Sequence, residues 1–228
     1  MKKILLIIAL GVLLTGCSVK WNYTPSVRQI SDGESKYTIN VQSFSDTRSD
    51  SAENDTIKAG KVILHWIPLV LWSNVTTVNK PEGNGIDMPS MTEVLPKNTA
   101  TELTNSGLFK NVTLNSNKSA DYTLKGTIVE TLTTRSATSY GLSFVGTLFE
   151  GIFWTPAGNA KNHMRIRFEL VNKSGNVILS KEYRSSSWKP FFVYKLFSKS
   201  GIGLQSQLYQ NINRQLVRDI EKALIRSE

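Results

Sequence analysis

Apolar and polar residues alternate in three stretches of the chain, which predicts β-strands. Within residues 36–44 every second residue from Tyr37 to Val41 is apolar, and within residues 122–130 every second residue from Tyr122 to Ile128 is apolar or glycine. The stretch from Met164 to Leu170 alternates in the same way. A period of two is typical of a strand with one buried face. The last stretch continues through the turn NKSGN at 172–176 into residues 177–184, which predicts a β-hairpin.

Two other stretches suggest helices. Residues 90–93 (SMTE) have the form of a capping box and should begin a helix that ends near Gly107. Pro96 lies inside this stretch, which predicts a kink or a later start of the helix. The C-terminal stretch should be an amphipathic helix of about six turns that packs on the sheet. Its apolar positions are Leu204, Leu208, Tyr209, Ile212, Leu216, Val217, Ile220 and Leu224, and its solvated positions include Arg214, Arg218 and Lys222.

Together with a short strand at 109–114, these elements predict a single α+β domain that covers residues 36–228. The order is strand, helix, four strands and helix, which indicates a mainly antiparallel sheet with the helices packed on one face. Two apolar segments, near 61–75 and 141–158, are inserted in this order. The first contains Pro68, which disfavours both a regular helix and a central strand, so we expect a buried strand that enters an apolar loop.

The N-terminus has the pattern of an export signal. Two lysines precede an apolar run from Ile4 to Leu14, and two small residues separate this run from Cys17. A transmembrane helix needs roughly 20 apolar residues, and this run is shorter, so residues 1–16 are predicted to be a signal peptide. Cys17 is the only cysteine in the chain, which excludes an intramolecular disulfide.

Residues 14–17 (LTGC) resemble the lipobox of bacterial lipoproteins. The resemblance implies that the Cys17 thiol receives a diacylglycerol, that the chain is cut before this residue, and that the new amino group is acylated with a fatty acid such as palmitate. Ser18 stands where an aspartate retains enterobacterial lipoproteins in the inner membrane, which implies the outer membrane and a periplasm-facing domain. Each buried methylene adds about 0.8 kcal/mol of membrane affinity, so several chains make a stable anchor.

Residues 17–35 would then be the lipidated N-terminus and a flexible tether. The stretch is polar, contains Pro25 and Gly33, and shows no sustained period. Fully extended, it could reach roughly 60 Å at about 3.3 Å per residue. The sequence therefore allows the domain to stand well away from the membrane.

Positive charge is concentrated in the last third of the chain. Residues 161–228 contain 13 lysines and arginines against 5 acidic residues, whereas residues 17–160 contain 12 against 13. An exported lipoprotein meets anionic lipid head groups, lipopolysaccharide phosphates and acidic protein surfaces, and we expect no nucleic acid among its partners. The alternative is a solvated basic face that has no particular ligand.

The chain lacks the sequence signatures of common catalytic and metal sites. Its only two histidines, His65 and His163, are far apart and should lie in different elements. The acidic stretch 46–55 lacks the spacing of a calcium loop, and no phosphate loop or serine elbow is present. We therefore expect a protein that is not an enzyme and needs no metal or cofactor. A hydrolase site assembled from distant carboxylates is the least favoured alternative.

Aromatic residues suggest a contact surface. Between residues 185 and 201 they alternate with lysines, and such a combination is typical of the membrane–water boundary. Exposed apolar patches usually mark a partner or a membrane. In the alternative interpretation, the rings fill a second small core beside the sheet. The candidate contact residues are Trp66, Trp72, Phe149, Phe153, Trp154, Trp188, Lys189, Phe191, Phe192, Tyr194 and Lys195.

Three short motifs resemble those of small Gram-negative outer-membrane lipoproteins. They are residues 46–48 (DTR), 106–109 (SGLF) and 120–126 (ADYTLKG). The similar proteins include the curli-secretion lipoprotein, lipoprotein activators of penicillin-binding proteins and the N-terminal domain of the Tol-system propeller protein. The resemblance implies a fold like that of the anticodon-binding domain, used as a docking module, and it implies no ligand-binding residue.

Our leading hypothesis is a non-enzymatic envelope lipoprotein that acts as a membrane-anchored docking or assembly module in the periplasm. The anchor raises the effective concentration of the domain for any partner near the membrane, so weak contacts suffice. The main alternative is an accessory of lipid or lipopolysaccharide transport that binds acyl chains. A dry groove would favour this alternative, and a flat exposed patch would favour docking.

Overall fold

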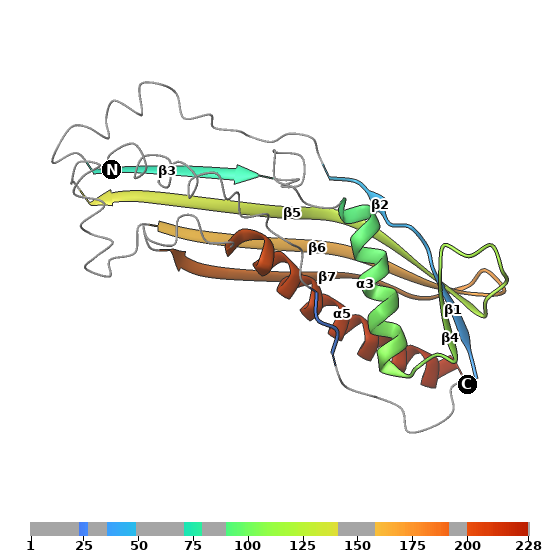
Figure 1. Cartoon of the computed structure of the whole chain (residues 1–228). Helices are drawn as coiled ribbons and strands as arrows, with labels where there is room; N and C mark the ends of the chain where they lie inside the picture. Colours follow the sequence, from blue (N-terminus) through green and yellow to red (C-terminus); the bar gives the residue numbers. More distant parts are fainter. Residues whose placement is uncertain are drawn as a thin grey trace, which may run out of the picture.

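A computed structural model describes residues 23–26, 36–48, 71–78, 90–140, 158–191 and 200–227. The chain is mixed α/β, and its elements roughly follow the predicted order (Figure 1). They are β1 (Thr38–Val41), β2 (Ser45–Asp46), β3 (Leu71–Val78), α3 (Met91–Ser106), β4 (Asn111–Leu114), β5 (Tyr122–Tyr140), β6 (Gly158–Asn172), β7 (Val177–Phe191) and α5 (Ser200–Ser227).

The strands form one seven-stranded mixed sheet. Five strands follow the order β4-β1-β5-β6-β7, and β2 and β3 both pair with β5. The long strands β3, β5, β6 and β7 pair antiparallel, as the sequence predicts. The short N-terminal strands differ, because β1 runs parallel to both β4 and β5, and β2 runs parallel to β5.

Because β1 lies between β4 and β5, the loop from β4 to β5 must cross its end. Two side chains of β1 hold this loop. The buried amide of Asn40 donates to the Ser116 carbonyl at 2.9 Å and accepts from the Ser116 N–H at 3.0 Å. The backbone N–H and the hydroxyl of Thr38 both donate to the Asp121 carboxylate at 2.8 Å. These bonds lower the pKa of Asp121 and account structurally for the aspartate of the ADYTLKG motif.

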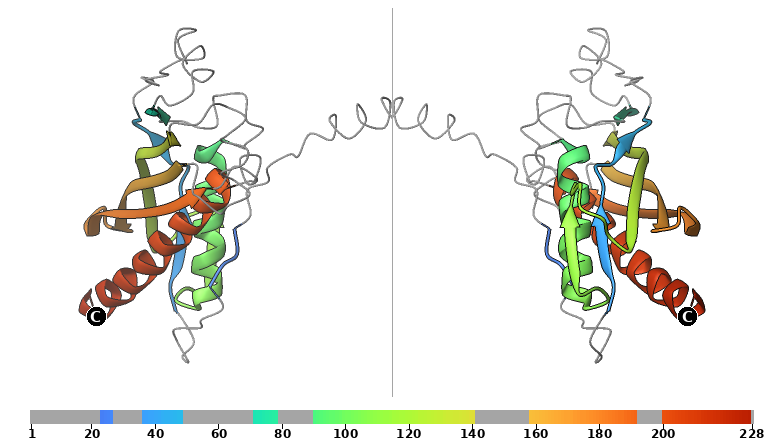
Figure 2. Two further views of the ribbon diagram at one scale, coloured as in Figure 1. Left: turned by 90° about the vertical axis from the view of Figure 1, so that its left-hand side faces the viewer. Right: turned by 90° about the vertical axis from the view of Figure 1, so that its right-hand side faces the viewer.

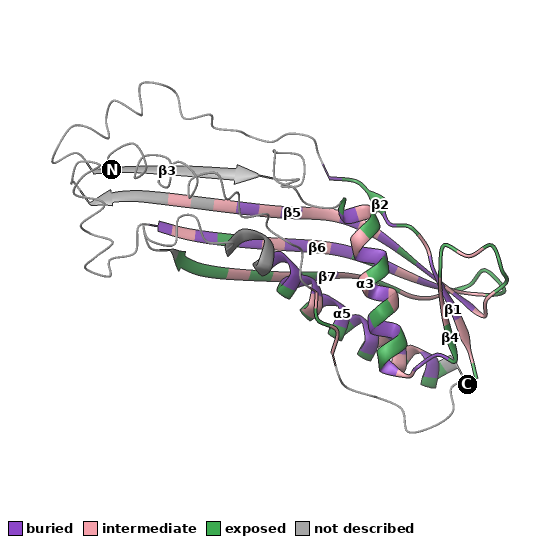
Figure 3. Ribbon diagram, in the orientation of Figure 1, coloured by how far each residue is buried: buried purple, intermediate pink, exposed green. Residues whose placement is uncertain are grey.

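The predicted alternation of the central strands is confirmed. In β6 every second residue is buried, including Met164, Ile166, Phe168 and Leu170 (Figure 3). The turn to β7 uses Gly175 at φ +84°, a conformation that favours glycine. Both hairpin strands extend well beyond the predicted boundaries, because β6 begins at Gly158 and β7 continues to Phe191.

The C-terminal helix is also confirmed. The apolar positions of α5 that are described, from Leu208 to Leu224, are buried, and α5 packs on β6 and β7. Helix α3 packs on α5, β1 and β4 (Figure 2). The hydroxyl of Tyr209 joins the two helices, because it donates to the Leu95 carbonyl at 2.8 Å and also bonds to the Thr99 hydroxyl.

The ends of α3 agree only partly with the prediction. The helix ends at Gly107 in the left-handed conformation, with φ +70°, as expected. At the other end Ser90 is the N-cap residue, but its hydroxyl bonds to the Thr92 hydroxyl at 2.7 Å and makes no capping-box bond. The prediction that Pro96 delays the start of the helix was wrong, since the helix begins at Met91 and includes the proline. Among the described helices none is long and apolar enough to cross a bilayer.

Candidate functional site

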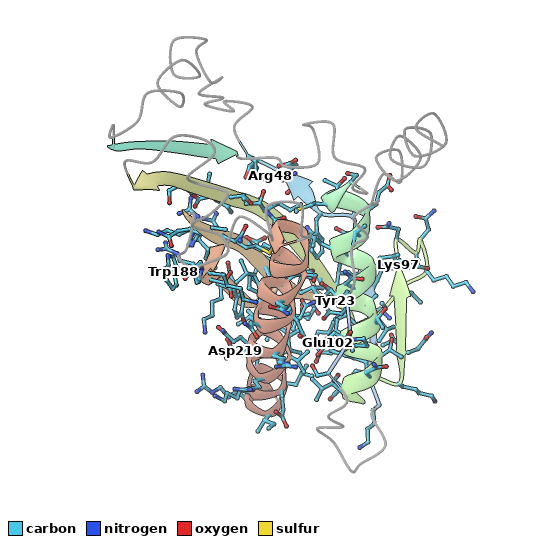
Figure 4. All side chains as sticks on the ribbon, turned by 60° about the vertical axis from the view of Figure 1, so that its left-hand side comes forward. Tyr23, Arg48, Lys97, Glu102, Trp188 and Asp219 are labelled. Carbon is cyan, nitrogen blue, oxygen red and sulfur yellow. The ribbon has the colours of Figure 1, made fainter. Side chains whose placement is uncertain are left out.

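The clearest polar cluster of functional interest joins the start of the chain to the two helices. Residues 23–26, which the sequence places in the tether, lie against α3 and α5 (Figure 4). The Tyr23 hydroxyl donates to the Glu102 carboxylate at 2.8 Å and accepts from the Asn213 amide at 2.9 Å. The backbone N–H of Ser26 donates to the same carboxylate at 3.0 Å and 3.2 Å. A carboxylate that accepts several such bonds makes a strong, charge-assisted contact.

Further contacts extend this cluster. The Tyr23 ring contacts the Tyr209 ring in a tilted arrangement, with centroids 5.9 Å apart, and the Gln210 amide donates to the Thr24 carbonyl. Burial raises the pKa of the Tyr23 phenol, so this hydroxyl stays protonated and remains a donor. We call this cluster the N-terminal dock; it consists of Tyr23, Thr24, Ser26, Glu102, Tyr209, Gln210 and Asn213.

The dock was not predicted, although two signals for it exist in the sequence. Glu102 lies one helical turn from Thr99 and Ser106, on the buried side of α3. The residue is only 3% exposed. A carboxylate on a buried helix face requires a partner. Tyr23 is an aromatic residue in a polar stretch. Nothing in the spacing of the two residues reveals that they meet, because 79 positions separate them.

The structure separates some residues of the predicted contact surface. Trp188 is 56% exposed on β7, so its ring is available for contact. Lys189 is also exposed, but successive residues of a strand point to opposite faces, so it does not extend the Trp188 surface. Trp72 lies on β3, which is separated from β7 by β5 and β6 in the sheet.

The other predicted contact residues lie outside what the structure describes. Phe191 is the last residue of β7, where its backbone pairs with Gly158, and its side chain is not described. The residues outside the described ranges are Cys17, Trp66, Phe149, Phe153, Trp154, Phe192, Tyr194 and Lys195. The prediction of an aromatic contact surface therefore stays a prediction for these positions.

The DTR motif is structural. The Arg48 guanidinium forms a two-pronged ion pair with the Asp46 carboxylate, at 2.8 Å and 2.9 Å, and donates to the Thr131 hydroxyl at 2.7 Å. It also contacts the Met91 sulfur at 3.8 Å. Since the Arg48 residue is only 6% exposed, the motif ties β2 and β5 to the start of α3.

The outward-facing side of β6 and β7 carries a network of opposite charges. Glu182 lies 3.0 Å from Arg184 and 3.5 Å from Arg167, and Arg165 lies 3.2 Å from Glu130. The Arg184 hydrogen bond in particular lowers the pKa of Glu182. His163 is near Glu130, at 3.7 Å, in this surface network. Within the described ranges, no group of three or more metal-ligating side chains comes together.

A groove of about 460 Å³ lies between β7 and the C-terminal half of α5. Among its described lining residues the carboxylate is that of Asp219, which accepts from Lys181 at 2.7 Å and from Tyr183 at 2.9 Å. Burial acts to raise the pKa of Asp219, but the two hydrogen bonds together with the charges of Lys181 and Lys222 outweigh burial and lower the pKa. Cations and apolar residues line the groove together, so it is not a dry channel; the lining residues are Ile178, Leu179, Lys181, Asp219, Lys222, Ala223 and Arg226.

Comparison with known proteins gives a likeness at the level of the fold. No family model and no curated protein matches the sequence. Protein XCC0632 from Xanthomonas campestris, described by the family model DUF330, superposes with a TM-score of 0.54 at 10% identity, over 92% of this chain and 97% of that one. The two proteins share a fold. At this identity the likeness carries no function.

Two further solved structures are more distant. The hypothetical protein CT253 from Chlamydia trachomatis has a TM-score of 0.41 at 12% identity, over 82% of this chain and 96% of that one. A PelC dodecamer from Paraburkholderia phytofirmans has a TM-score of 0.36 at 14% identity, over 82% of this chain and 89% of that one.

Proposed function

We propose that the chain is a non-enzymatic lipoprotein of the bacterial outer membrane, anchored through Cys17, whose folded domain acts in the periplasm by docking. The observation that carries this proposal is the N-terminal dock. Only six positions separate Cys17 from Tyr23, which contacts both helices. A cysteine with the lipobox pattern thus stands immediately before the point where the chain joins its folded domain.

The N-terminal dock shortens the expected distance between the folded domain and the bilayer. From Cys17 to Tyr23 the chain spans at most about 20 Å, at about 3.3 Å per residue. The whole tether of residues 17–35 would allow roughly three times this distance. With the dock closed, the domain therefore stays near the head groups, and a partner within the same layer meets it at high effective concentration.

Trp188 is our proposed docking position on the domain. It is a large exposed ring on β7, the last strand in the order β4-β1-β5-β6-β7. Strands at the end of a sheet offer backbone groups to a partner chain, and an aromatic ring adds buried area. These features support contact with an envelope protein. The groove beside Asp219 has mixed charged and apolar walls, which favours docking over an acyl-chain carrier.

The proposed arrangement of the domain places α3 and α5 on the same face of the sheet. The alternating burial of β6 supports this, since its buried side chains all point to one face. Contacts of α3 with α5 support it as well (Figure 2). Both helices on one face is also the arrangement that the resemblance to anticodon-binding-like lipoprotein modules implies. We propose that the domain is such a module.

Site-specific photo-crosslinking in intact cells tests this function. A photoreactive residue at Trp188 should yield a discrete crosslinked protein, and the same residue at Lys118, exposed after β4, should yield none. Replacing Cys17 with serine should abolish the Trp188 product, because the unanchored domain loses its high local concentration. Equal products from both positions, or a Trp188 product that is unchanged without Cys17, would contradict anchored docking.

A further inference from the structure

Four cations form a row along α5. Arg214, Arg218, Lys222 and Arg226 follow one another at intervals of four residues, and all four residues are exposed. Side chains with this spacing are neighbours on a helix, and each lies about 6 Å further along the axis at a rotation of about 40°. Arg214, Arg218 and Lys222 therefore share a surface about 12 Å long, whereas Arg226 is turned by about 120° from Arg214. We call these three residues the basic row.

Acidic side chains offset the positive charge of this stretch only in part, because two acidic residues stand among its four cations. On the described part of α5 the acidic residues are Asp219 and Glu221. Asp219 accepts from Lys181 of β7 at 2.7 Å and from Tyr183 at 2.9 Å, and Lys222 is the residue of the row whose charge also acts on this carboxylate. The row thus contributes much of the positive excess that the sequence concentrates in its last third.

The N-terminal dock lies at one end of this row. Gln210, which donates to the Thr24 carbonyl, is four residues before Arg214 and therefore one turn away on the same side of the helix. Thr24 consequently meets α5 about 6 Å from the start of the row. If Cys17 is acylated, the bilayer lies within about 20 Å of Tyr23, as argued above.

We propose that the basic row is a contact surface for anionic lipid head groups, which the closed N-terminal dock holds next to the bilayer. The proposal rests on the lipid anchor of the proposed function for its geometry. Charge complementarity and chain length both identify the lipid surface as the occupant, because the acylated residue enters the bilayer only six positions before Tyr23. An acidic protein partner would be a different occupant, and the test below distinguishes it.

Electrostatics sets the size of the expected effect. Charges in solution interact over about 8 Å at physiological ionic strength, so the row contributes only when it lies close to the head groups. Each basic residue near an anionic membrane contributes about 1 kcal/mol. Loss of three such residues should therefore lower the partition coefficient on the order of a hundredfold, at about 1.4 kcal/mol per factor of ten.

The first experiment uses the full mature chain without its anchor, as a Cys17→Ser variant, with vesicles of phosphatidylcholine alone or mixed with phosphatidylglycerol. The protein should sediment with the mixed vesicles and much less with the neutral ones. In the triple variant Arg214→Gln, Arg218→Gln and Lys222→Gln, the partition coefficient for the mixed vesicles should fall on the order of a hundredfold. A matched variant removes the same charge from exposed positions beside β4 and on β5, with Lys110→Gln, Lys118→Gln and Lys125→Gln, and should bind within a fewfold of the parent.

The second experiment measures the position of α5 in the anchored protein. Since Cys17 would be acylated, an Asn211→Cys variant has one free thiol, beside the row on an exposed position of α5, which can carry a fluorophore. Lipids with a nitroxide on the head group should quench this fluorophore more than one at Lys118→Cys. Opening the dock with Tyr23→Phe and Glu102→Gln should reduce the quenching at residue 211 towards the value at residue 118.

The two experiments separate this inference from the proposed function. Selective loss of vesicle binding in the basic-row variant supports the contact surface even if Cys17 carries no lipid. Equal losses in the basic-row and matched variants, or no preference for phosphatidylglycerol, would overturn it. Binding to an acidic protein but not to the mixed vesicles would overturn it as well. Equal quenching at residues 211 and 118 in an anchored protein would refute the role of the dock.

Discussion

A conservative change at Glu102 tests whether the N-terminal dock stabilises the protein. Glu102→Gln keeps the shape of the side chain but removes its charge. The carboxylate accepts from the Tyr23 hydroxyl at 2.8 Å and from the Ser26 N–H at 3.0 Å and 3.2 Å. In glutamine the oxygen at the Oε2 position can keep the Tyr23 and Ser26 bonds only as neutral ones, and the NH₂ group at the Oε1 position turns a donor towards the Ser26 N–H.

The structure sets the expected magnitude. Hydrogen bonds to a charged group contribute about 1.5 to 3 kcal/mol each, and neutral bonds about half as much. Because both donors are partly buried, weakening their two contacts should lower the free energy of unfolding by about 2 kcal/mol. The loss cannot exceed the free energy of docking, since the segment can detach while the rest of the domain stays folded.

Urea unfolding of four proteins measures this coupling. They are the mature chain, its Glu102→Gln variant, a chain that begins at Val27, and that shorter chain with Glu102→Gln. The substitution should cost about 2 kcal/mol in the mature chain and less than about 0.5 kcal/mol in the shorter chain, which lacks Tyr23 and Ser26. As a control, Tyr122→Phe removes a phenol hydroxyl that takes no part in the described bonds of the dock and should act equally in both lengths. The same cost of Glu102→Gln in both lengths would refute the dock as its cause.

Three further changes test the fold. Asp46→Ala should destabilise the protein by about 2 to 3 kcal/mol in urea unfolding, because the Arg48 side chain is only 2% exposed and loses its ion pair; a loss under about 0.5 kcal/mol would argue against the pair. Gly126→Ala places a Cβ about 2.6 Å from the Phe44 ring and should cost about 1 to 3 kcal/mol, and an unchanged melting temperature would contradict this packing. Asp121→Asn should lower stability at neutral pH. Since the folded-state pKa of Asp121 is lowered, its contribution is present above about pH 4 and is lost as the pH falls further, so a difference from wild type that persists undiminished in acid would exclude this linkage.

The sequence predicts the elements whose side chains repeat strictly. In β6 the positions Met164, Ile166, Phe168 and Leu170 alternate, and in α5 the apolar residues recur every four positions, so burial alone determines both elements. The second half of β5 lacks this signal. Its residues 131–140 (TLTTRSATSY) are mostly small or hydroxylated, and pairing with β3 and β6 makes them a strand. Pairing partners are distant in sequence, so periodicity does not reveal them.

The parallel strands and the N-terminal dock both depend on contacts between residues that are far apart in the sequence. The position of β1 between β4 and β5 depends on Asn40 and Thr38, whose partners Ser116 and Asp121 lie more than 70 positions away. Glu102 meets Tyr23 across a similar distance. Polar side chains at buried positions signal that a partner exists without identifying it. The local sequence patterns therefore predicted the main strands and helices, whereas the candidate site became visible only in the three-dimensional structure.

Mass spectrometry of the mature N-terminus tests the central claim most directly. The protein is purified from membranes of the producing cell, digested, and the N-terminal peptide is identified. Our account predicts a peptide that begins at Cys17 and carries fatty acyl groups on its sulfur and its amino group. A chain that still begins at Met1, or a Cys17 with a free thiol and a free amino group, would contradict the account.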